Sequence, residues 1–473
     1  MKKKLLSVLL ATTMIATLFV GCGKTEEAAT ATPTKAAAGA TVAPEATTAP
    51  VVEEGKVFNI YCWNDEFQSR VKDFYPGYVD NGDGTGVIGD VKVNWVITPS
   101  ADNAYQNALD AALLTQGEAA TDAKVDLFLI EADYALKYVS AETPVAMDVA
   151  DIGLTTEDMA NQYQYTKDIV TDTNGIQRGS TWQATPGLFA YRRSIAKEVL
   201  GTDDPAEVQA KISNWDDFNA VAAEMSAASY KMLSGYDDSY RTFSNNVTSP
   251  WVQDGKIVID PSVMAWVDQT KDFTDKGYNN KTTLWAPEWS ADQGPEGKVF
   301  GFFYSTWGIN FTLMGNSLAD AEATAEVGNG IYGDYAVCEG PAPFYWGGTW
   351  ICGAVGTDNT TLVKDIMLAL TCDSDTMKSI TTETQDYTNN QAAMEEIAAS
   401  DFKSEFLGGQ NHIALFAAAA PKIDMSNISP YDQTCNEEIQ TAFHDYFNGT
   451  VTKDEALTNF YKAVTTKHPE LTY

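Results

Sequence analysis

Strand-like and helix-like patterns of apolar residues alternate in the first part of the chain. Apolar runs at 57–63, 91–97 and 125–130 predict strands, and the segments 64–75 and 103–114 have helical spacing. Strands that alternate with helices indicate βαβ units, so we expect an α/β fold with a mainly parallel sheet.

Acidic and aromatic residues follow two of these predicted strands. Trp63, Asp65 and Glu66 come after the first strand, and Glu131 and Asp133 come after the third. Ligands of open α/β sheets bind beyond the carboxyl ends of strands, so these side chains are candidate ligand contacts.

Helix capping is the competing interpretation for the acids. Asn64 can cap a helix whose first turn contains Asp65 and Glu66, where the helix dipole favours negative charge. A helix at 134–139 needs a cap as well, and Asp133 suits that role better than Glu131. Capping does not require an indole, so it explains the two acids but not the presence of Trp63.

Composition narrows the classes of function. The net charge is −34, and no basic stripe is present, which excludes nucleic acid as a partner. Residues 56–473 are long enough for two lobes. The three histidines are far apart and lack metal-site spacing, so we expect no metal and no cofactor. Beyond Cys22 there are five cysteines, which leaves room for one disulfide, for example Cys338 to Cys352.

The N-terminus has the features of an export signal. Three lysines precede an apolar stretch at 5–20, and Gly21 and Cys22 follow it. Residues 18–22, "LFVGC", resemble the bacterial lipobox, in which the cysteine is lipidated. We therefore expect residues 1–22 to be a lipoprotein signal peptide, with lipidation at Cys22, and residues 23–55 to be a disordered tether. The alternative is an ordinary signal peptide with an incidental cysteine.

Several later motifs carry a resemblance to a known family. They are "GSTWQATPGLFAYRRSIAKEV" (179–199), "NWDDF" (214–218), "GKVFGFFYSTWGINF" (297–311), "GPAPFYWGGTWICGAVGTDNTTLVKDIMLALT" (340–371) and "GTVTKDEALTNFYKAV" (449–464). In this order, and with the lipobox, the chain resembles the extracellular solute-binding lipoproteins of carbohydrate ABC importers, solute-binding protein family 1, which includes maltose-binding protein.

The resemblance implies a two-lobed periplasmic-binding-protein fold, type II-like, with a hinge of about three crossings. Lobe 1 would hold residues 56–185 and 342–388, and lobe 2 residues 186–341 and 389–473. It also implies a monomer, exported and lipid-anchored on the outer face of the bacterial cytoplasmic membrane. Such a protein captures a sugar or oligosaccharide between its lobes and delivers it to permease subunits.

A sugar cleft needs flat aromatic walls and convergent polar groups. The tryptophans outside apolar stripes are Trp63, Trp182, Trp251, Trp285, Trp289, Trp307, Trp346 and Trp350. Trp307 matches a cleft tryptophan of maltose-binding protein. With Trp63 and Trp307 we select as ligand-binding candidates Trp182, Trp346, Trp350, Asp65, Glu66, Asn103, Tyr105, Glu131, Asp133 and Asp432, the last with a capping alternative.

Two other functions fit the composition. Tryptophans with acids also form cages for cationic amines, which would keep the fold and change the ligand. A pair of carboxylates about 5–9 Å apart would instead make a secreted glycoside-acting enzyme, although no nucleophile elbow or P-loop is present in the sequence.

Overall fold

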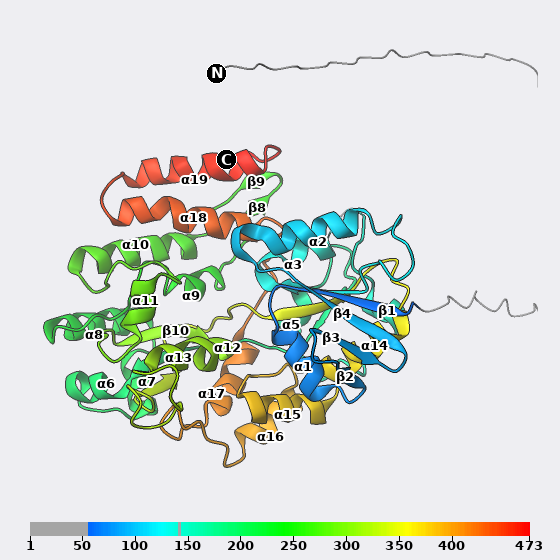
Figure 1. Ribbon diagram of the computed structural model, residues 1–473. Coiled ribbons are helices and arrows are strands. Elements are labelled where there is room, and N and C mark those ends of the chain that lie inside the picture. The colour runs from blue at the N-terminus through cyan, green and yellow to red at the C-terminus, as the bar shows by residue number, and fades with distance from the viewer. Residues whose placement is uncertain (1–54, 141–142) are drawn as a thin grey trace, which may run out of the picture. The chain divides into compact units, whose positions relative to one another are not determined.

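The computed structural model of the chain describes residues 55–140 and 143–473, which fold into three groups of packed elements (Figure 1). Cys22, the expected signal peptide and all but the last residue of the expected tether lie outside the described residues. Within the described ranges, no helix combines the length and the apolar character needed to cross a membrane.

A seven-stranded sheet contains the strands predicted at 57–63, 91–97 and 125–130. Its order is β2-β3-β4-β1-β5-β12-β6, and only β1 with β4 and β1 with β5 pair in parallel. The expectation of a mainly parallel sheet was therefore wrong. The strands are β1 Val57–Cys62, β2 Tyr78–Asp80, β3 Thr85–Ile88, β4 Val91–Ile97, β5 Leu127–Glu131, β6 Ser180–Thr181 and β12 Thr349–Gly353.

Two local causes make the sheet mixed. Glycine-rich turns fold β2, β3 and β4 into an antiparallel meander, in which Gly82 and Gly84 have positive φ angles of 75° and 85°. Asp80 and Asp83 stabilise the first turn by accepting hydrogen bonds from the backbone N–H groups of Gly82 and Thr85. On the other side, β12 returns from a distant part of the chain and pairs antiparallel to both β5 and β6.

Helices cover both faces of this sheet. Phe58 and Ile60 of β1 pack on one face with α1, α4, α14 and α15, and Phe128 and Ile130 of β5 pack on the other with α2, α3 and α5. The bounds are α1 Glu66–Phe74, η1 Ala101–Asn103, α2 Ala104–Leu114, η2 Ala132–Tyr134, α3 Ala135–Val139, α4 Val149–Ile152, α5 Gln164–Asp168, α14 Thr360–Thr371 and α15 Ser374–Thr384.

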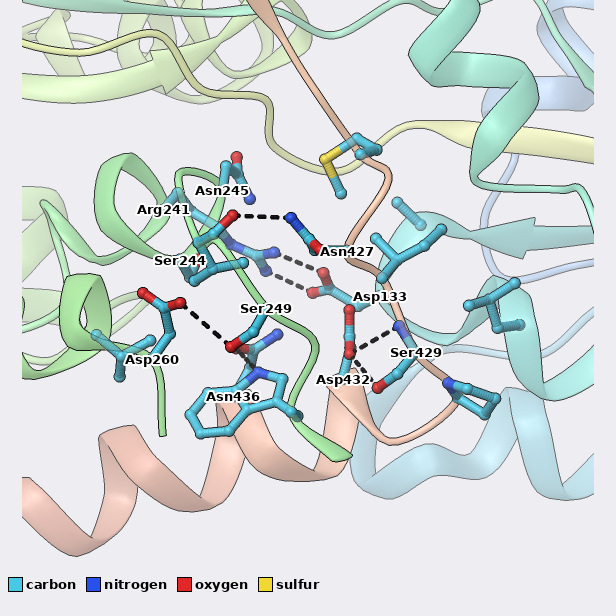
Figure 2. Close-up of a pocket in the computed structure, with 18 of the residues that line it drawn as sticks. Asp133, Arg241, Ser244, Asn245, Ser249, Asp260, Asn427, Ser429, Asp432 and Asn436 are labelled. Carbon is cyan, nitrogen blue, oxygen red and sulfur yellow. Dashed lines mark hydrogen bonds and ion pairs between the residues drawn. The ribbon is translucent and has the colours of Figure 1, made fainter. Parts of the chain in front are cut away.

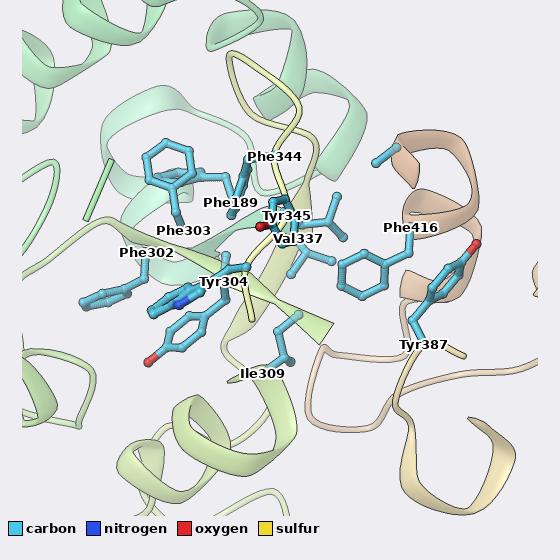
Figure 3. Close-up of a cluster of buried hydrophobic side chains, with 14 of the residues drawn as sticks. Phe189, Phe302, Phe303, Tyr304, Ile309, Val337, Phe344, Tyr345, Tyr387 and Phe416 are labelled. Carbon is cyan, nitrogen blue, oxygen red and sulfur yellow. The ribbon is translucent and has the colours of Figure 1, made fainter. Parts of the chain in front are cut away.

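A second, three-stranded sheet has the order β10-β7-β11, with β7 antiparallel to both neighbours. Aromatic side chains from β7 and β10 fill its core, among them Phe189, Phe303 and Tyr304 (Figure 3). The elements are β7 Gly187–Arg192, β10 Gly301–Ser305, β11 Tyr335–Cys338, α6 Arg193–Leu200, α7 Pro205–Lys211, α8 Trp215–Ala227, α11 Pro287–Asp292, α12 Thr306–Gly308, the π-helical η3 Ile309–Leu313, α13 Met314–Ser317, α16 Gln391–Ala398, α17 His412–Ala419 and η4 Ala420–Lys422.

A third group of elements forms around a separate apolar core. Trp266 of α10 and Phe443 of α18 are both fully buried in it. Its members are α9 Tyr240–Ser244, the hairpin of β8 Val252–Gln253 and β9 Lys256–Ile257, α10 Pro261–Lys276, α18 Asp432–Phe447 and α19 Lys453–Lys467.

Three segments run side by side between the two large sheets. Gly187 and Trp346 donate backbone hydrogen bonds to Phe344 and Thr185, at 2.7 and 3.2 Å. A third segment joins the first through hydrogen bonds from Ala184 N–H to Tyr387 (3.1 Å) and from Asn389 N–H to Trp182 (2.8 Å). The predicted set of about three crossings is thus confirmed.

The five cysteines of the described part are unpaired, so the disulfide considered between Cys338 and Cys352 is absent there. Cys338 lies on β11 of the second sheet and Cys352 on β12 of the first, which places them in different sheets. Burial raises the pKa of both thiols, so they behave as apolar core groups.

We predict that Tyr105→Phe lowers the free energy of unfolding by about 1–2 kcal/mol. The Tyr105 hydroxyl lies 3.1 Å from the carbonyl of Tyr61 and 2.6 Å from that of Leu129, and so connects the ends of β1 and β5. Urea unfolding measures the change. Tyr446→Phe is the control, since its hydroxyl has no hydrogen bond within the described residues; equal losses in both variants would contradict the prediction.

Candidate functional site

An ion pair connects the edge of the first sheet to the third group of elements. Asp133 lies in η2, directly after β5, and its carboxylate accepts two hydrogen bonds from the Arg241 guanidinium of α9 (Figure 2). The Nη1 to Oδ1 distance is 2.5 Å, and the two side chains are only 19% and 23% exposed. A bidentate pair of this kind fixes the distance and the orientation between the two elements.

Glu131 takes the capping role that was expected of Asp133. Its carboxylate accepts a hydrogen bond from the backbone N–H of Asp133 at 3.0 Å and caps η2. Burial raises the pKa of Glu131, and the neighbouring Asp133 carboxylate raises it further. The expectation that capping suits Asp133 better was wrong, because Asp133 points to Arg241.

A pocket opens beside this ion pair (Figure 2). Aromatic side chains from Tyr134, Trp251 and Tyr345 line it together with polar ones from Asn245, Asn427, Asn436 and Asp432. Many of these polar groups already have partners in the protein. Asn436 Oδ1 accepts hydrogen bonds from the Tyr240 hydroxyl and from Trp251 Nε1, at 2.5 and 3.1 Å.

Asp432 stands at the start of α18 in this pocket. Its Oδ1 accepts hydrogen bonds from the backbone N–H and the hydroxyl of Ser429, at 3.0 and 2.6 Å. Burial raises the pKa of Asp432 to about 7. These bonds hold the turn before α18, and the helix itself starts without a side-chain cap, so the capping alternative is not formed; Asp432 lines the pocket.

Three tryptophans form a cluster at the carboxyl end of β10. Trp307 Nε1 donates a hydrogen bond to the Trp346 carbonyl at 3.0 Å, which fixes the orientation of the Trp307 indole. The ring centroids of Trp307 and Trp346 are 5.6 Å apart, and Trp285 stacks on Trp307 at 6.2 Å with an interplanar angle of 19°. Trp346 is 9% exposed and Trp285 is 54% exposed, so the cluster runs from the core to the solvent.

A polar network joins α1 to the tryptophan cluster. Gln183 Nε2 donates hydrogen bonds to Glu66 at 3.0 Å and to Asp386 at 2.9 Å, and Thr306 donates to Asp386 at 2.7 Å. Thr306 precedes Trp307 directly. Burial raises the pKa of Glu66 to about 7, despite the attraction of Arg70.

Asn64 contributes to the same end of α1. Its side chain accepts a hydrogen bond from the backbone N–H of Glu66 at 3.1 Å, as the capping interpretation requires. Asp65 is solvent-exposed and Glu66 faces Gln183, so the two adjacent acids have different environments. Asp65 makes no side-chain capping hydrogen bond of its own.

Trp63, Tyr105 and Asn103 lie around the carboxyl end of the central strands. Trp63 is half-buried and packs edge-on against Tyr105, with 5.4 Å between ring centroids. Tyr105 is 1% exposed and its hydroxyl faces backbone carbonyls. Asn103 is exposed with a left-handed φ of 59°, beside Asp102 with a φ of 53°.

The structure places the other two candidate tryptophans in the core of the first sheet. Trp182 and Trp350 are both fully buried. Trp182 stacks on Phe67 at 5.3 Å, and Trp350 Nε1 donates to the Thr166 carbonyl at 2.8 Å. Neither residue joins the pocket or the tryptophan cluster in this conformation.

Sequence reasoning did not select four residues that the structure brings to these places. Arg241, Gln183 and Asp386 meet partners that are 80 to 203 positions away in sequence. No local pattern indicates such a pairing. Trp285, in contrast, did have a signal in the sequence. It is one of the tryptophans outside apolar stripes and could have been selected as a ligand-binding candidate for that reason.

Among the described residues, no group of three or more histidine, cysteine or acidic side chains is arranged to hold a metal ion. Neither a model of a protein family nor a curated protein matches the sequence. The solved structures do give matches.

An extracellular solute-binding protein family 1 structure matches with a TM-score of 0.68 and 15% sequence identity, over 87% of this chain and 99% of that one. The ABC transporter associated binding protein from B. animalis subsp. lactis Bl-04, in complex with beta-1,6-galactobiose, matches with a TM-score of 0.62 and 17% identity, over 88% and 99%. Maltose-bound T. maritima MalE3 matches with a TM-score of 0.59 and 14% identity, over 87% and 99%. The two-lobed fold that the resemblance implied is confirmed.

We predict that Asp133→Asn lowers the free energy of unfolding by about 1–3 kcal/mol, because the largely buried Arg241 loses its bidentate ion-pair partner. Urea unfolding measures this loss, and small-angle X-ray scattering should show a larger radius of gyration. The control is Asp110→Asn, which breaks the exposed Lys137–Asp110 pair and should cost about 0–1 kcal/mol. A loss no larger than in this control would contradict the structural role of the pair.

A pH dependence follows from Glu66. Its folded-state pKa of about 7 lies above the ordinary value of 4.5, so the folded chain binds the proton more tightly than the unfolded chain. The corresponding stabilisation is complete below pH 4.5 and is lost as the pH rises to about 7. We predict that Glu66→Gln flattens this fall between pH 5 and 8, as measured by urea midpoints. Parallel curves for the two proteins would contradict the assignment.

Proposed function

We propose that the protein is the substrate-binding subunit of an ABC transporter and captures a sugar or oligosaccharide between two lobes. The observation that carries this proposal is the tryptophan cluster beside the polar network of Glu66, Gln183 and Asp386. Glu66 lies on α1 beside the first sheet, and Trp307 follows β10 of the second sheet. The other members, Gln183, Trp346 and Asp386, lie on the segments that cross between the two sheets.

The chemistry of the two groups suits a carbohydrate. Sugar hydroxyls donate to carboxylates and pair with amides, while the C–H face of a pyranose packs on an indole and leaves water. Trp307 offers a ring whose orientation is fixed by its hydrogen bond to Trp346. A pre-oriented ring loses little side-chain entropy on binding, so more of the contact energy is available as affinity.

The structural neighbours support the same class of ligand. Three of these neighbours are bound to beta-1,6-galactobiose, lacto-N-biose and maltose. We extend this class to the present chain, and we propose that the protein binds its ligand without chemical conversion.

The remaining features of the proposal come from the sequence. Lipidation of Cys22 would anchor the exported protein on the outer face of the bacterial cytoplasmic membrane, next to the permease subunits that receive the sugar. Residues 56–185 with 342–388 would form lobe 1, and 186–341 with 389–473 lobe 2. Both large sheets are consistent with this division, since each is built from strands of one proposed lobe. We propose a monomer.

A ligand screen tests the function. The melting temperature of the purified protein is measured with single monosaccharides, oligosaccharides and polyamines. The oligosaccharides are also incubated with the protein and assayed for new reducing ends. A sugar at 100 times its dissociation constant should stabilise the protein by about 2.7 kcal/mol, which raises the melting temperature by a few degrees. Trp307→Ala should weaken binding of that sugar at least about tenfold, or about 1.4 kcal/mol.

Two controls make the screen decisive. Tyr473→Ala removes an exposed aromatic residue, 66% accessible, from the C-terminal end of the chain and should leave affinity unchanged. Trp307→Phe keeps a ring but loses the hydrogen bond to Trp346, and should fall between the parent and Trp307→Ala. A shift with a polyamine and none with any sugar would reject the carbohydrate class, and new reducing ends would reject a pure binding role.

A further inference from the structure

Trp285 is an exposed residue in a conformation that tryptophan rarely adopts. Its φ angle is 68°, in the left-handed region, and its side chain is 54% exposed. A bulky side chain in this region is strained, and an exposed indole gains little from burial. The backbone conformation disfavours tryptophan at this position, and the contacts with neighbouring aromatic rings leave more than half of the side chain exposed.

The surrounding structure holds Trp285 in place. Ala286 is extended and Pro287 starts α11, which fixes the chain direction immediately after Trp285. Trp289, one turn further along α11, is 1% exposed, and its Nε1 donates to Asp238 at 2.8 Å. The strained residue is therefore connected to a rigid, buried anchor.

In the left-handed conformation, the Trp285 indole lies against three other tryptophans. The ring centroid of Trp285 lies 5.2 Å from Trp289, 5.7 Å from Trp346 and 6.2 Å from Trp307. Its near-parallel, offset arrangement on Trp307 makes two aromatic platforms that follow each other from the interior to the solvent.

We propose that Trp285 is a specificity-determining residue that selects ligands of two or more sugar units. This inference rests on the proposed function and deepens it. One sugar ring contacts Trp307 in the interior, and the next ring packs its apolar face on Trp285 at the rim. A monosaccharide held at Trp307 gains nothing from Trp285, whereas a longer ligand removes the exposed indole from water.

The test compares ligand lengths on four proteins. Parent, Trp285→Ala, Trp285→Phe and Tyr473→Ala are titrated by calorimetry with glucose and α-1,4-linked glucose oligomers of two to four units. The same is done with glucose oligomers in β-1,4 linkage, and with galactose and β-1,6-linked galactose oligomers. In the series that binds, affinity of the parent should rise at least tenfold from one unit to the longest ligand.

The variants separate specificity from folding. Trp285→Ala should lose about tenfold or more of its affinity for the longest ligand, with less than a twofold change for the shortest one that binds. Trp285→Phe should lie in between, and Tyr473→Ala should equal the parent. Trp285→Gly is a second variant in case alanine impairs folding, since glycine adopts the left-handed φ without strain and should show the same length-dependent loss.

Several results would overturn the inference. The inference is wrong if the parent binds the monosaccharide as tightly as its oligomers. It is also wrong if Trp285→Ala weakens the binding of all ligand lengths equally, or of none. In these cases sugar binding itself persists and the proposed function stands. Absence of binding to every sugar, by the folded parent, would instead reject the proposed function and the inference with it.

Discussion

The pairing of the crossing segments determines where everything else in this protein can lie. Backbone that leaves one sheet for another must find hydrogen-bond partners outside both sheets. Here the segments around 185, 346 and 387 pair with one another. Tyr345 and Trp346 are consecutive residues of one crossing, and their side chains serve the pocket and the tryptophan cluster respectively. One backbone interaction thus positions both halves of the candidate site.

Carboxylates connect the first sheet to its surroundings at two places, the polar network of Glu66 and Asp386 and the ion pair of Asp133 with Arg241. Glu66, Asp133 and Asp386 are largely buried, and their partners are amide and hydroxyl donors and two arginines, Arg70 and the bidentate Arg241. Burying carboxylates costs desolvation energy that offsets much of the attraction. The net stabilisation from these contacts is therefore smaller than their number suggests.

The sequence predicted what depends on local patterns. The alternation of apolar residues located β1, β4 and β5, and the Asn64 cap is where the helix signal placed it. The mixed pairing was missed because strand direction depends on where a distant segment returns, as β12 does. The pairing of Asp133 was missed because its partner, Arg241, is 108 positions away. Trp182 and Trp350 were selected for their position along the chain, but burial depends on packing that only the folded structure shows.

The backbone strain at Trp285 is compatible with a stable fold, because it affects one residue whereas three other tryptophans stabilise the side chain. A left-handed tryptophan costs about 1–3 kcal/mol, and the contacts with Trp289, Trp307 and Trp346 are aromatic pairs worth about 0.5–1.5 kcal/mol each. These contacts can offset the strain without covering the outer face of the indole. The arrangement therefore keeps an apolar face of the Trp285 indole in water at almost no net cost to folding. The free energy of removing this face from water is then available to a ligand that covers it.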